Sequence, residues 1–152
     1  MDMSRQIKNI IAITVFLICI SLINVAGQNI EIEIRGMNAF TFILIIAVLL
    51  QVIFFIPSFL LKTEKYYDIV GSLTYIITIS IAYFSVENKT MIDSIIYFYV
   101  MVWALRLGIY LFRRVRNDGK DVRFEKAKKH FFWFLQYWMG QALWVSLTAC
   151  AA

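Results

Sequence analysis

The stretch from Trp103 to Phe124 carries the residues best suited to chemistry. It begins as an apolar run with one cation, Arg106, and continues into a dense basic segment that contains Lys120-Asp121-Val122-Arg123. A charge inside a membrane-length apolar run costs roughly 3 kcal/mol on insertion scales, so Arg106 is a candidate functional residue. Two roles are open for it. Its side chain snorkels to the interface or pairs with a carboxylate, or it contacts an anion in a pocket between helices.

An acid between two cations distinguishes the segment Lys120-Asp121-Val122-Arg123 from a plain basic anchor. A loop that lies on anionic lipid explains the neighbouring cations without any chemistry. Such a loop does not need Asp121, whereas a phosphate-binding pocket does, because a carboxylate orients the bidentate fork of an arginine. Both interpretations, lipid anchor and phosphate pocket, stay open for this loop.

The composition is that of a membrane protein. The chain has 152 residues, of which 61% are hydrophobic, and its mean hydropathy is +0.73, whereas soluble chains are usually about 45–50% apolar. The net charge of +5 does not indicate nucleic-acid binding, because the basic residues flank apolar runs. With His130 as the only histidine, we expect no histidine-based metal site, and we expect Cys19 and Cys150 to be reduced, buried side chains.

Five apolar stretches approach or exceed the roughly 17–25 residues that a helix needs to cross a bilayer. Because backbone polar groups cannot stay unpaired in lipid, each stretch should be a helix. The sequence therefore predicts an all-α, polytopic membrane protein with one transmembrane domain over residues 1–152. The predicted spans are 9–26, 39–61, 69–86, 94–112 and 131–152. A cleaved signal peptide is the alternative for the first span, since Arg5 and Lys8 precede it.

The cations also predict the orientation of the chain. Of the fifteen Lys and Arg residues, twelve fall on one side of the predicted spans, and only Arg35 and Lys89 fall on the other. Because positive loops stay inside, this asymmetry places the N-terminus in the cytoplasm. The outer loop near Glu31 and Glu33 alternates acids with isoleucine, so we expect a short strand-like or interfacial turn there.

Several polar residues near the second and third spans carry structural predictions. Pro57 should kink or end its helix near Phe55. Gln51 should make an interhelical hydrogen bond or contact a ligand. Asp68 is predicted to cap the third helix, and Asp121 to cap a short helix over 122–130.

Two further predictions concern packing and pairing. Gly71 and Ser72 are small enough to let helices approach closely. Glu64 and Asp68 lie on the same predicted side as the basic loop and could pair with it. In the last span, Trp138, Gln141 and Trp144 share one helical face, which serves either packing or ligand binding.

Three motifs occur together: Lys62-Thr-Glu-Lys-Tyr-Tyr-Asp68, then Trp103-Ala-Leu-Arg106-Leu-Gly108 with Gly119-Lys-Asp121-Val-Arg123-Phe124, then Phe134, Trp138 and Gln141-Ala-Leu-Trp144. This pattern, over roughly residues 40–147, resembles the steroid 5-alpha-reductase-like membrane family. It is most similar to the branch labelled as a domain of unknown function.

The resemblance implies NADPH held near the cytoplasmic face. It implies hydride delivery to a carbon–carbon double bond conjugated to a carbonyl, in a lipid or steroid-like substrate. By motif, Arg106, Asp121 and Arg123 would bind or brace the cofactor's phosphates. We assign no catalytic residue, because steroid-reducing relatives have a Gln-Glu pair where Gln51 is followed here by Val52.

Relatives continue through further spans with an Asn/Arg-rich cofactor-binding segment. We therefore expect this chain to be the N-terminal part of a longer protein and inactive alone. The alternative is a non-catalytic membrane protein that binds anionic lipid or a partner membrane protein through its basic loop. A transporter fragment is disfavoured, because no inverted repeats are visible. We expect membrane lipids as partners, helix–helix oligomers as an option, and a bacterial inner membrane rather than endoplasmic reticulum.

Overall fold

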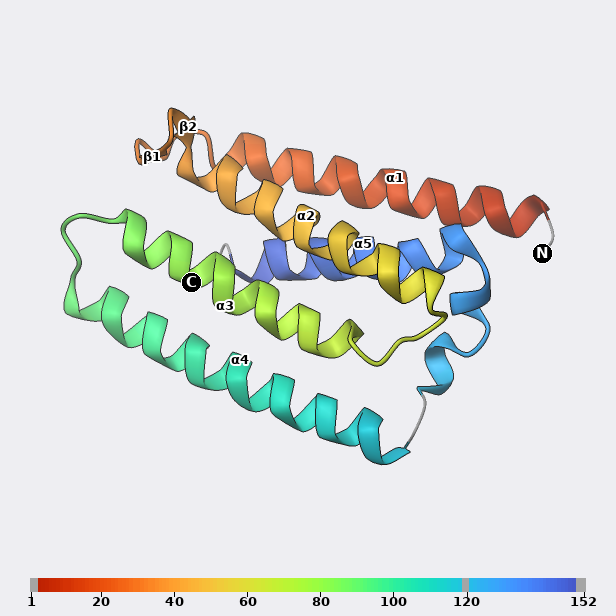
Figure 1. Ribbon diagram of the computed structural model, residues 1–152. Coiled ribbons are helices and arrows are strands. Elements are labelled where there is room, and N and C mark those ends of the chain that lie inside the picture. The colour runs from red at the N-terminus through yellow and green to blue at the C-terminus, as the bar shows by residue number, and fades with distance from the viewer. Residues whose placement is uncertain (1–2, 119–120, 150–152) are drawn as a thin grey trace.

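The computed structural model describes residues 3–118 and 121–149 and is built from long helices (Figure 1). These helices are α1 (Met3–Ala26), α2 (Ala39–Leu60), α3 (Tyr67–Ser85), α4 (Met91–Asp118) and α5 (Phe131–Ala149). A hairpin of β1 (Glu33–Ile34) and β2 (Met37–Asn38) joins α1 to α2. Two 3-10 turns, η1 (Val122–Phe124) and η2 (Ala127–Lys129), lie between α4 and α5.

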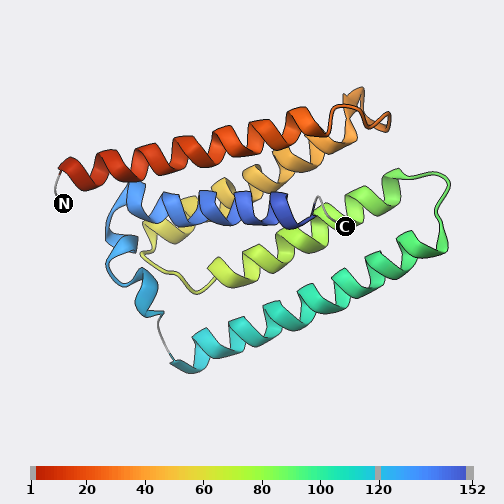
Figure 2. The same ribbon diagram turned by 180° about the vertical axis from the view of Figure 1, so that it is seen from behind.

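Helix α5 lies at the centre of the bundle and α4 at its edge. α5 packs on α1, α2 and α3, whereas α4 packs on α3. α5 lies behind α2 in Figure 1 and in front of it in Figure 2. One end of the bundle gathers the start of α1, the α2–α3 connection and both 3-10 turns. We call this the inner end, after the predicted orientation, and the end with the hairpin the outer end.

The polytopic all-α class is confirmed. Within the described residues, α1, α2, α3 and α4 are each long and apolar enough to cross a membrane. Helix α5 has 19 residues and covers most of the fifth predicted span. It is not among the four helices that are apolar enough to be candidate membrane spans. The fifth crossing and the cytoplasmic N-terminus therefore remain predictions. Cys19 is free and partly buried, and Cys150 lies outside the described residues.

An aromatic cluster fills the inner end between α2, α3, α5 and η1. Phe55, Phe124, Phe134 and Trp138 are buried there, with Tyr67 packed against them. The ring of Phe124 lies 4.7 Å from the ring of Tyr67 and 6.0 Å from that of Phe134, in tilted and edge-to-face arrangements that aromatic pairs prefer. Phe124 thereby fixes the segment after α4 to the bundle, although that segment has no long helix of its own.

Small residues on α3 and α4 allow the close approach that the sequence suggested. A Cβ atom added to Gly108 on α4 would lie 2.8 Å from Cβ of Ser72 on α3. A Cβ atom added to Gly71 would lie 2.2 Å from Nε2 of Gln141 on α5. Both distances are shorter than van der Waals contact, so larger residues would push these helices or side chains apart.

Of the two outcomes predicted for Pro57, the end of the helix near Phe55 is wrong, because α2 continues through Pro57 to Leu60, and the kink stays a prediction. A proline removes only its own N–H bond and leaves the later ones intact. The helix ends instead in a Schellman turn: the amide of Thr63 donates to the carbonyl of Ser58, and that of Lys62 donates to Phe59. Lys62 takes the left-handed conformation that this turn requires, with φ of 50°.

The outer loop forms the strand-like turn that the sequence suggested. Glu33 pairs with Asn38, and Ile34 pairs with Met37, in an antiparallel ladder. Arg35 and Gly36 make the two-residue connection with φ of 53° and 76°. Two positive φ angles suit the right-handed twist of a tight hairpin. Asn38 then caps α2 by accepting from the amides of Phe40 and Thr41.

Gln51 makes the predicted interhelical hydrogen bond. Its Nε2 donates to Oγ1 of Thr74 on α3 over 3.0 Å, and both residues have no solvent exposure. We expect Thr74→Val to destabilise the folded protein by about 1 kcal/mol, because Gln51 would lose its partner in a buried site. Thermal unfolding in detergent would measure this. Thr14→Val removes a hydroxyl that bonds only to its own helix and should have little effect. Equal losses in the two variants would contradict the assigned role.

Candidate functional site

Four charged side chains meet at the inner end, and we call them the ion-pair cluster: Asp68, Arg114, Asp121 and Arg123. Nη2 of Arg123 lies 2.5 Å from Oδ2 of Asp121 and 3.7 Å from Oδ2 of Asp68. Nη2 of Arg114 lies 3.6 Å from Asp68 and 3.7 Å from Asp121. Each carboxylate therefore contacts both guanidinium groups, and the cluster joins α3, α4 and the segment before η1.

The acids of the ion-pair cluster point inward and the cations face outward. The side chains of Asp68 and Asp121 are 11% and 10% exposed, whereas those of Arg114 and Arg123 are 40% and 53% exposed. Nε and Nη2 of Arg123 both donate to Asp121, which makes the pair bidentate. Such a pair fixes the plane of the guanidinium group, and its other N–H groups stay available.

Asp121 itself is held by the backbone. It caps η1, because its Oδ1 accepts from the amide of Arg123 over 2.9 Å. Its own amide donates to Oε1 of Glu64 over 3.1 Å. Oε2 of Glu64 lies 2.6 Å from Nζ of Lys128. The predicted pairing of Glu64 and Asp68 with the basic loop is thus confirmed for both acids.

The hydrogen bonds from Arg123 set the electrostatics of the pair. They hold the pKa of the Asp121 carboxyl below its usual value. The same hydrogen bonds to Asp121 raise the pKa of the Arg123 guanidinium. Asp121 and Arg123 therefore both stay charged across the physiological pH range.

Two local predictions for this region need correction. Asp68 is not the N-cap of α3, since Tyr66 occupies the cap position without a side-chain hydrogen bond and Asp68 lies in the first turn. Its carboxylate is used by Arg114 and Arg123 instead. The short helix expected over 122–130 is two separate 3-10 turns, although its cap at Asp121 is confirmed. Gly119 and Lys120, which precede Asp121 in the motif, lie outside the described residues.

Arg106 lies outside the ion-pair cluster, in a groove along α4 that we call the arginine groove. The groove has a volume of about 560 Å³ and is lined by Arg106, Ile109, Tyr110, Arg113, Arg114 and Asn117. Neither Arg106 nor Arg113 pairs with an acid among the described side chains. Arg114 lines the arginine groove and also belongs to the ion-pair cluster, so the two sites adjoin at this residue.

Sequence reasoning did not assign Arg114 to the site. It falls in a run of similar cations, and only the register of α4 against α3 selects it from Arg113 and Arg116. The sequence did contain one indication of such a residue. Asp68 is an acid at the inner end of an apolar span, and a partly buried acid needs a cation from a neighbouring helix. That signal predicts a partner in the basic segment but does not identify which one.

A second candidate site is a trough along α5, which we call the α5 trough. It has a volume of about 410 Å³ and is lined on α5 by Trp133, Gln136, Tyr137, Gly140, Gln141 and Trp144. Phe16 of α1 and Tyr67 of α3 form its sides. Trp138 has no exposure and packs in the aromatic cluster, whereas Gln141 and Trp144 line the trough. The predicted shared face is therefore divided between packing and a cavity.

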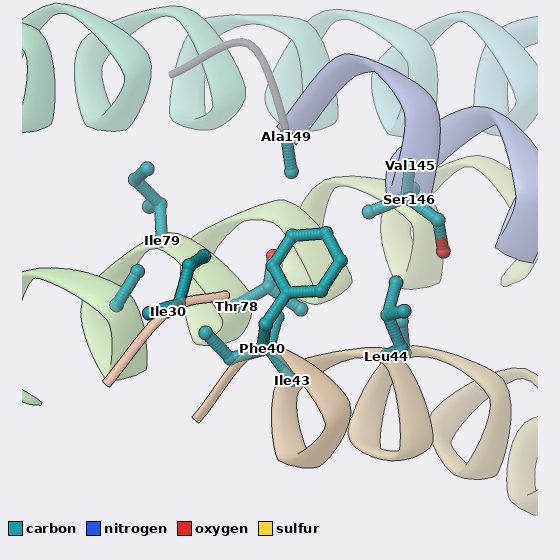
Figure 3. A pocket seen from close by; sticks show the side chains of 11 residues that line it. Ile30, Phe40, Ile43, Leu44, Thr78, Ile79, Val145, Ser146 and Ala149 are labelled. Carbon is teal, nitrogen blue, oxygen red and sulfur yellow. The ribbon is translucent and has the colours of Figure 1, made fainter. Parts of the chain in front are cut away.

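A third hollow, the outer pocket, is smaller and almost wholly apolar. It encloses about 160 Å³, and Figure 3 shows Phe40 and Leu44 of α2, Ile79 of α3 and Val145 of α5 around it. Its hydroxyl groups are already satisfied, since Thr78 and Ser146 each donate to a carbonyl of their own helix. This pocket can therefore accept hydrocarbon but offers a ligand little hydrogen bonding.

No set of three His, Cys, Asp or Glu side chains in the described ranges is arranged to hold a metal ion. The polar chemistry of the described residues thus centres on arginine, carboxylate and amide groups.

With this geometry in hand, comparison with known proteins adds one result. The family described as Protein of unknown function (DUF1295) matches residues 54–152, which include α3, α4, α5 and the whole ion-pair cluster. The chain belongs to this family. No curated protein and no solved structure matches it.

Lys128 provides a test of how the basic segment is held. We expect Lys128→Met to destabilise the protein by about 2 kcal/mol, because the side chain of Glu64 is only 3% exposed and would keep an uncompensated charge. Chemical or thermal unfolding in detergent would measure the change. The exposed neighbour Lys129→Met is the matched control and should change stability little. A loss no larger than the control's would show that Glu64 does not depend on Lys128.

The lowered pKa of Asp121 predicts a pH dependence. The Asp121 carboxyl binds a proton less readily in the folded state than in the unfolded chain. Its contribution to the stability of the fold is therefore complete above the ordinary carboxyl pKa of about 4, and it is lost as the pH falls through the lowered pKa of the folded state. We expect Asp121→Asn to lower the melting temperature at neutral pH, and the difference from wild type to shrink below about pH 4. Glu31→Gln, in the outer loop away from the ion-pair cluster, is the control for the loss of one carboxylate as such. A difference that persists at low pH would contradict the assignment.

Proposed function

We propose that this chain forms the phosphate-binding part of a membrane-embedded reductase of the steroid 5-alpha-reductase-like type. Such an enzyme uses NADPH to reduce a carbon–carbon double bond conjugated to a carbonyl in a lipid or steroid-like substrate. The observation that carries the proposal is the ion-pair cluster, in which two carboxylates orient two outward-facing arginines. Membership in the DUF1295 family supports the resemblance on which the reaction type rests.

The residues fit a pyrophosphate-bearing cofactor. A guanidinium group has five N–H donors, and Asp121 uses only part of those of Arg123. The ion-pair cluster is neutral as a whole, so it orients donors but adds no net attraction for an anion. That attraction comes from the arginine groove, where Arg106 and Arg113 carry charges that no described acid offsets. Oriented donors beside uncompensated cations are what phosphate recognition needs.

When bound, NADPH supplies the hydride, and the chain's own residues bind it and exclude water. Asp121 holds the Arg123 fork in one plane, and Asp68 holds both arginines against α3. The aromatic cluster lies directly beneath, through Phe124 and Tyr67, and keeps that side of the site dry. A dry, preorganised site strengthens each charge interaction with a phosphate.

The test is a titration of the native protein, expressed from its own coding sequence, with NADPH. We expect Arg123→Ala to weaken NADPH binding by roughly 10- to 100-fold, because charge-assisted hydrogen bonds contribute about 1.5–3 kcal/mol. Arg123→Lys should recover only part of the affinity, since an ammonium group cannot make the bidentate contact. Isothermal titration calorimetry in nanodiscs would measure the constants.

Arg35→Ala is the matched control, because Arg35 lies in the outer hairpin. It should leave NADPH affinity within about twofold, as expected for a surface charge distant from the ligand. Equal affinity for the Arg123→Ala variant and the wild type would overturn the proposed role of the cluster.

Binding of anionic lipid is the second candidate, and a specific observation favours it. Arg116, Lys126 and Lys129 are exposed at the inner end, where lipid headgroups would lie. Lipid binding that falls with each lost lysine but survives Asp121→Ala would favour this function over the cofactor site. For either function we propose a bacterial inner membrane, on the branch that the motifs resemble.

A further inference from the structure

Helices α1 and α2 leave a groove between them, which we call the α1–α2 groove. The two helices are in close contact next to the hairpin, where a Cβ atom added to Gly27 would overlap the ring of Phe40, and they diverge from there (Figures 1 and 2). The groove has a volume of about 340 Å³, which is within the range of about 300–1,000 Å³ that is typical of small-molecule sites. Its polar end is lined by Ser21, Asn24 and Thr41, and its apolar wall by Leu44, Val48 and Leu49.

The side-chain amide of Asn24 is held so that its nitrogen atom stays free. Its Oδ1 accepts from the hydroxyl of Thr41 over 2.7 Å and from Nε2 of Gln28 over 3.2 Å. These two donors determine which end of the amide faces them, so Nδ2 points the other way. Nδ2 donates to no described residue, and it is not among the unpaired atoms that the protein encloses. Because Asn24 lines the groove and is only partly buried, a molecule in the groove can reach this nitrogen.

The two hydroxyl groups at the polar end have no donor to spare. The hydroxyl of Ser21 donates to the carbonyl of Leu17 over 2.9 Å, and that of Thr41 donates to Asn24. Each hydroxyl has one O–H group, so the unused N–H groups of Asn24 are the donors that this end of the groove offers. The group that matches them is a hydrogen-bond acceptor on an otherwise apolar molecule.

The positions of these residues on α1 and α2 set the depth of the donor in the membrane. Both helices are candidate membrane spans, Asn24 lies in the last turn of α1, and Thr41 lies in the first turn of α2. The polar end therefore lies where the hydrocarbon meets the headgroups, which is also where the ester groups of glycerolipids lie. From Thr41 to Leu49 the groove follows α2 for about 12 Å, at about 1.5 Å per residue. This is most of the depth of one leaflet, because the whole hydrocarbon core is about 30 Å thick.

We infer that the α1–α2 groove binds a diacyl glycerolipid, with one acyl chain along the apolar wall and its ester carbonyl accepting from Nδ2 of Asn24. General contact with lipid needs neither a groove nor a free amide at this depth. A helix from a second copy would cover the apolar wall, but its backbone carbonyls are bonded within the helix and would leave Nδ2 without an acceptor. The inference is independent of the reductase proposal, because the hairpin end of the groove and the ion-pair cluster lie at opposite ends of the bundle (Figure 1).

Lipid titrations of the native protein, followed by native mass spectrometry, test the ester contact. The two probes are dioleoyl phosphatidylcholine and its diether analogue, which lacks the carbonyl groups. At the tightest site the ester lipid should bind roughly 3- to 10-fold more tightly than the ether lipid, as expected for one hydrogen bond. Phosphatidylcholine has no net charge, so the cations at the inner end do not favour either probe. Equal affinities of the wild type for the two lipids would overturn the inference.

Two variants of Asn24 should remove the preference for the ester lipid. Asn24→Leu removes the amide. Asn24→Asp keeps an acceptor for Thr41 and Gln28 but has no N–H group, and the titration is made at about pH 8, where an ordinary carboxyl is ionised. The readout is the ratio of the two affinities, which a general loosening of the groove would not change. A preference that persists in both variants would show that another group holds the ester and would contradict the assignment.

Ser21→Phe tests the place of binding, because the added ring would fill the polar end of the groove. Ser21 is exposed and bonds to its own helix, so the fold should persist. Binding of the ester lipid should fall by about tenfold or more, since the acyl chain would lose its contacts between the helices. Thr14→Phe is the matched control, because Thr14 is also an exposed hydroxyl bonded to its own helix but does not line the groove. Unchanged binding in Ser21→Phe would place the lipid elsewhere and overturn the inference.

Disulfide cross-linking in membranes tests the competing occupant, a helix from a second copy. Ile45 lines the groove and is 41% exposed. Ile45→Cys, combined with Cys19→Ser and Cys150→Ser, should stay monomeric under oxidising conditions, because lipid fills the groove. Disulfide-linked dimers as the main product would show that a second copy covers the groove, and they would overturn the inference.

Discussion

The inner end of this protein depends on one buried carboxylate, that of Glu64. Its two oxygens join the amide of Asp121 to the ammonium group of Lys128, so they hold the basic segment on both sides of η1. Phe124 lies between these two contacts and is 1% exposed. A buried charge is tolerated only when it is paired and hydrogen-bonded, and Glu64 meets both conditions through residues far along the chain. The segment after α4 is therefore ordered by charge and by one aromatic ring rather than by helix formation.

This anchoring determines what the arginines can do. Because Asp121 is fixed by the backbone, Arg123 has one preferred plane, and Arg114 completes the contact from α4. The first turn of α3 links this polar region to the interior, since Tyr67 turns toward the aromatic cluster and the trough while Asp68 turns toward the cations. The side chains of successive residues on a helix point in directions about 100° apart. A single turn of α3 therefore contributes Tyr67 to the aromatic cluster and Asp68 to the ion-pair cluster.

Local features of the sequence predicted local features of the structure. The apolar runs predicted the long helices, and an acid before η1 predicted its cap. An amide in hydrocarbon predicted an interhelical hydrogen bond, and the structure supplies Thr74 as the partner of Gln51. The errors arose where a distant partner decides the outcome. Asp68 has the composition of a helix cap, but two guanidinium groups hold its carboxylate. Arg114 is distinguished from its neighbouring cations only by the packing of α4 on α3, which no spacing within the segment reveals.

The length of helix α5 alone does not establish that it crosses the membrane. It has the same 19 residues as α3 but carries Gln136 and Gln141 along one face. An amide facing lipid loses its hydrogen bonds to water and gains none in return, so such a face is stable only against a partner. Nε2 of Gln51 donates to Thr74, while Oε1 of Gln51 and Oε1 of Gln141 both lack a donor among the described residues. The two glutamines differ in exposure: Gln51 is wholly buried between helices, whereas Gln141 is partly exposed along the α5 trough, so length and polarity alone do not distinguish a helix facing its neighbours from one with an open polar face.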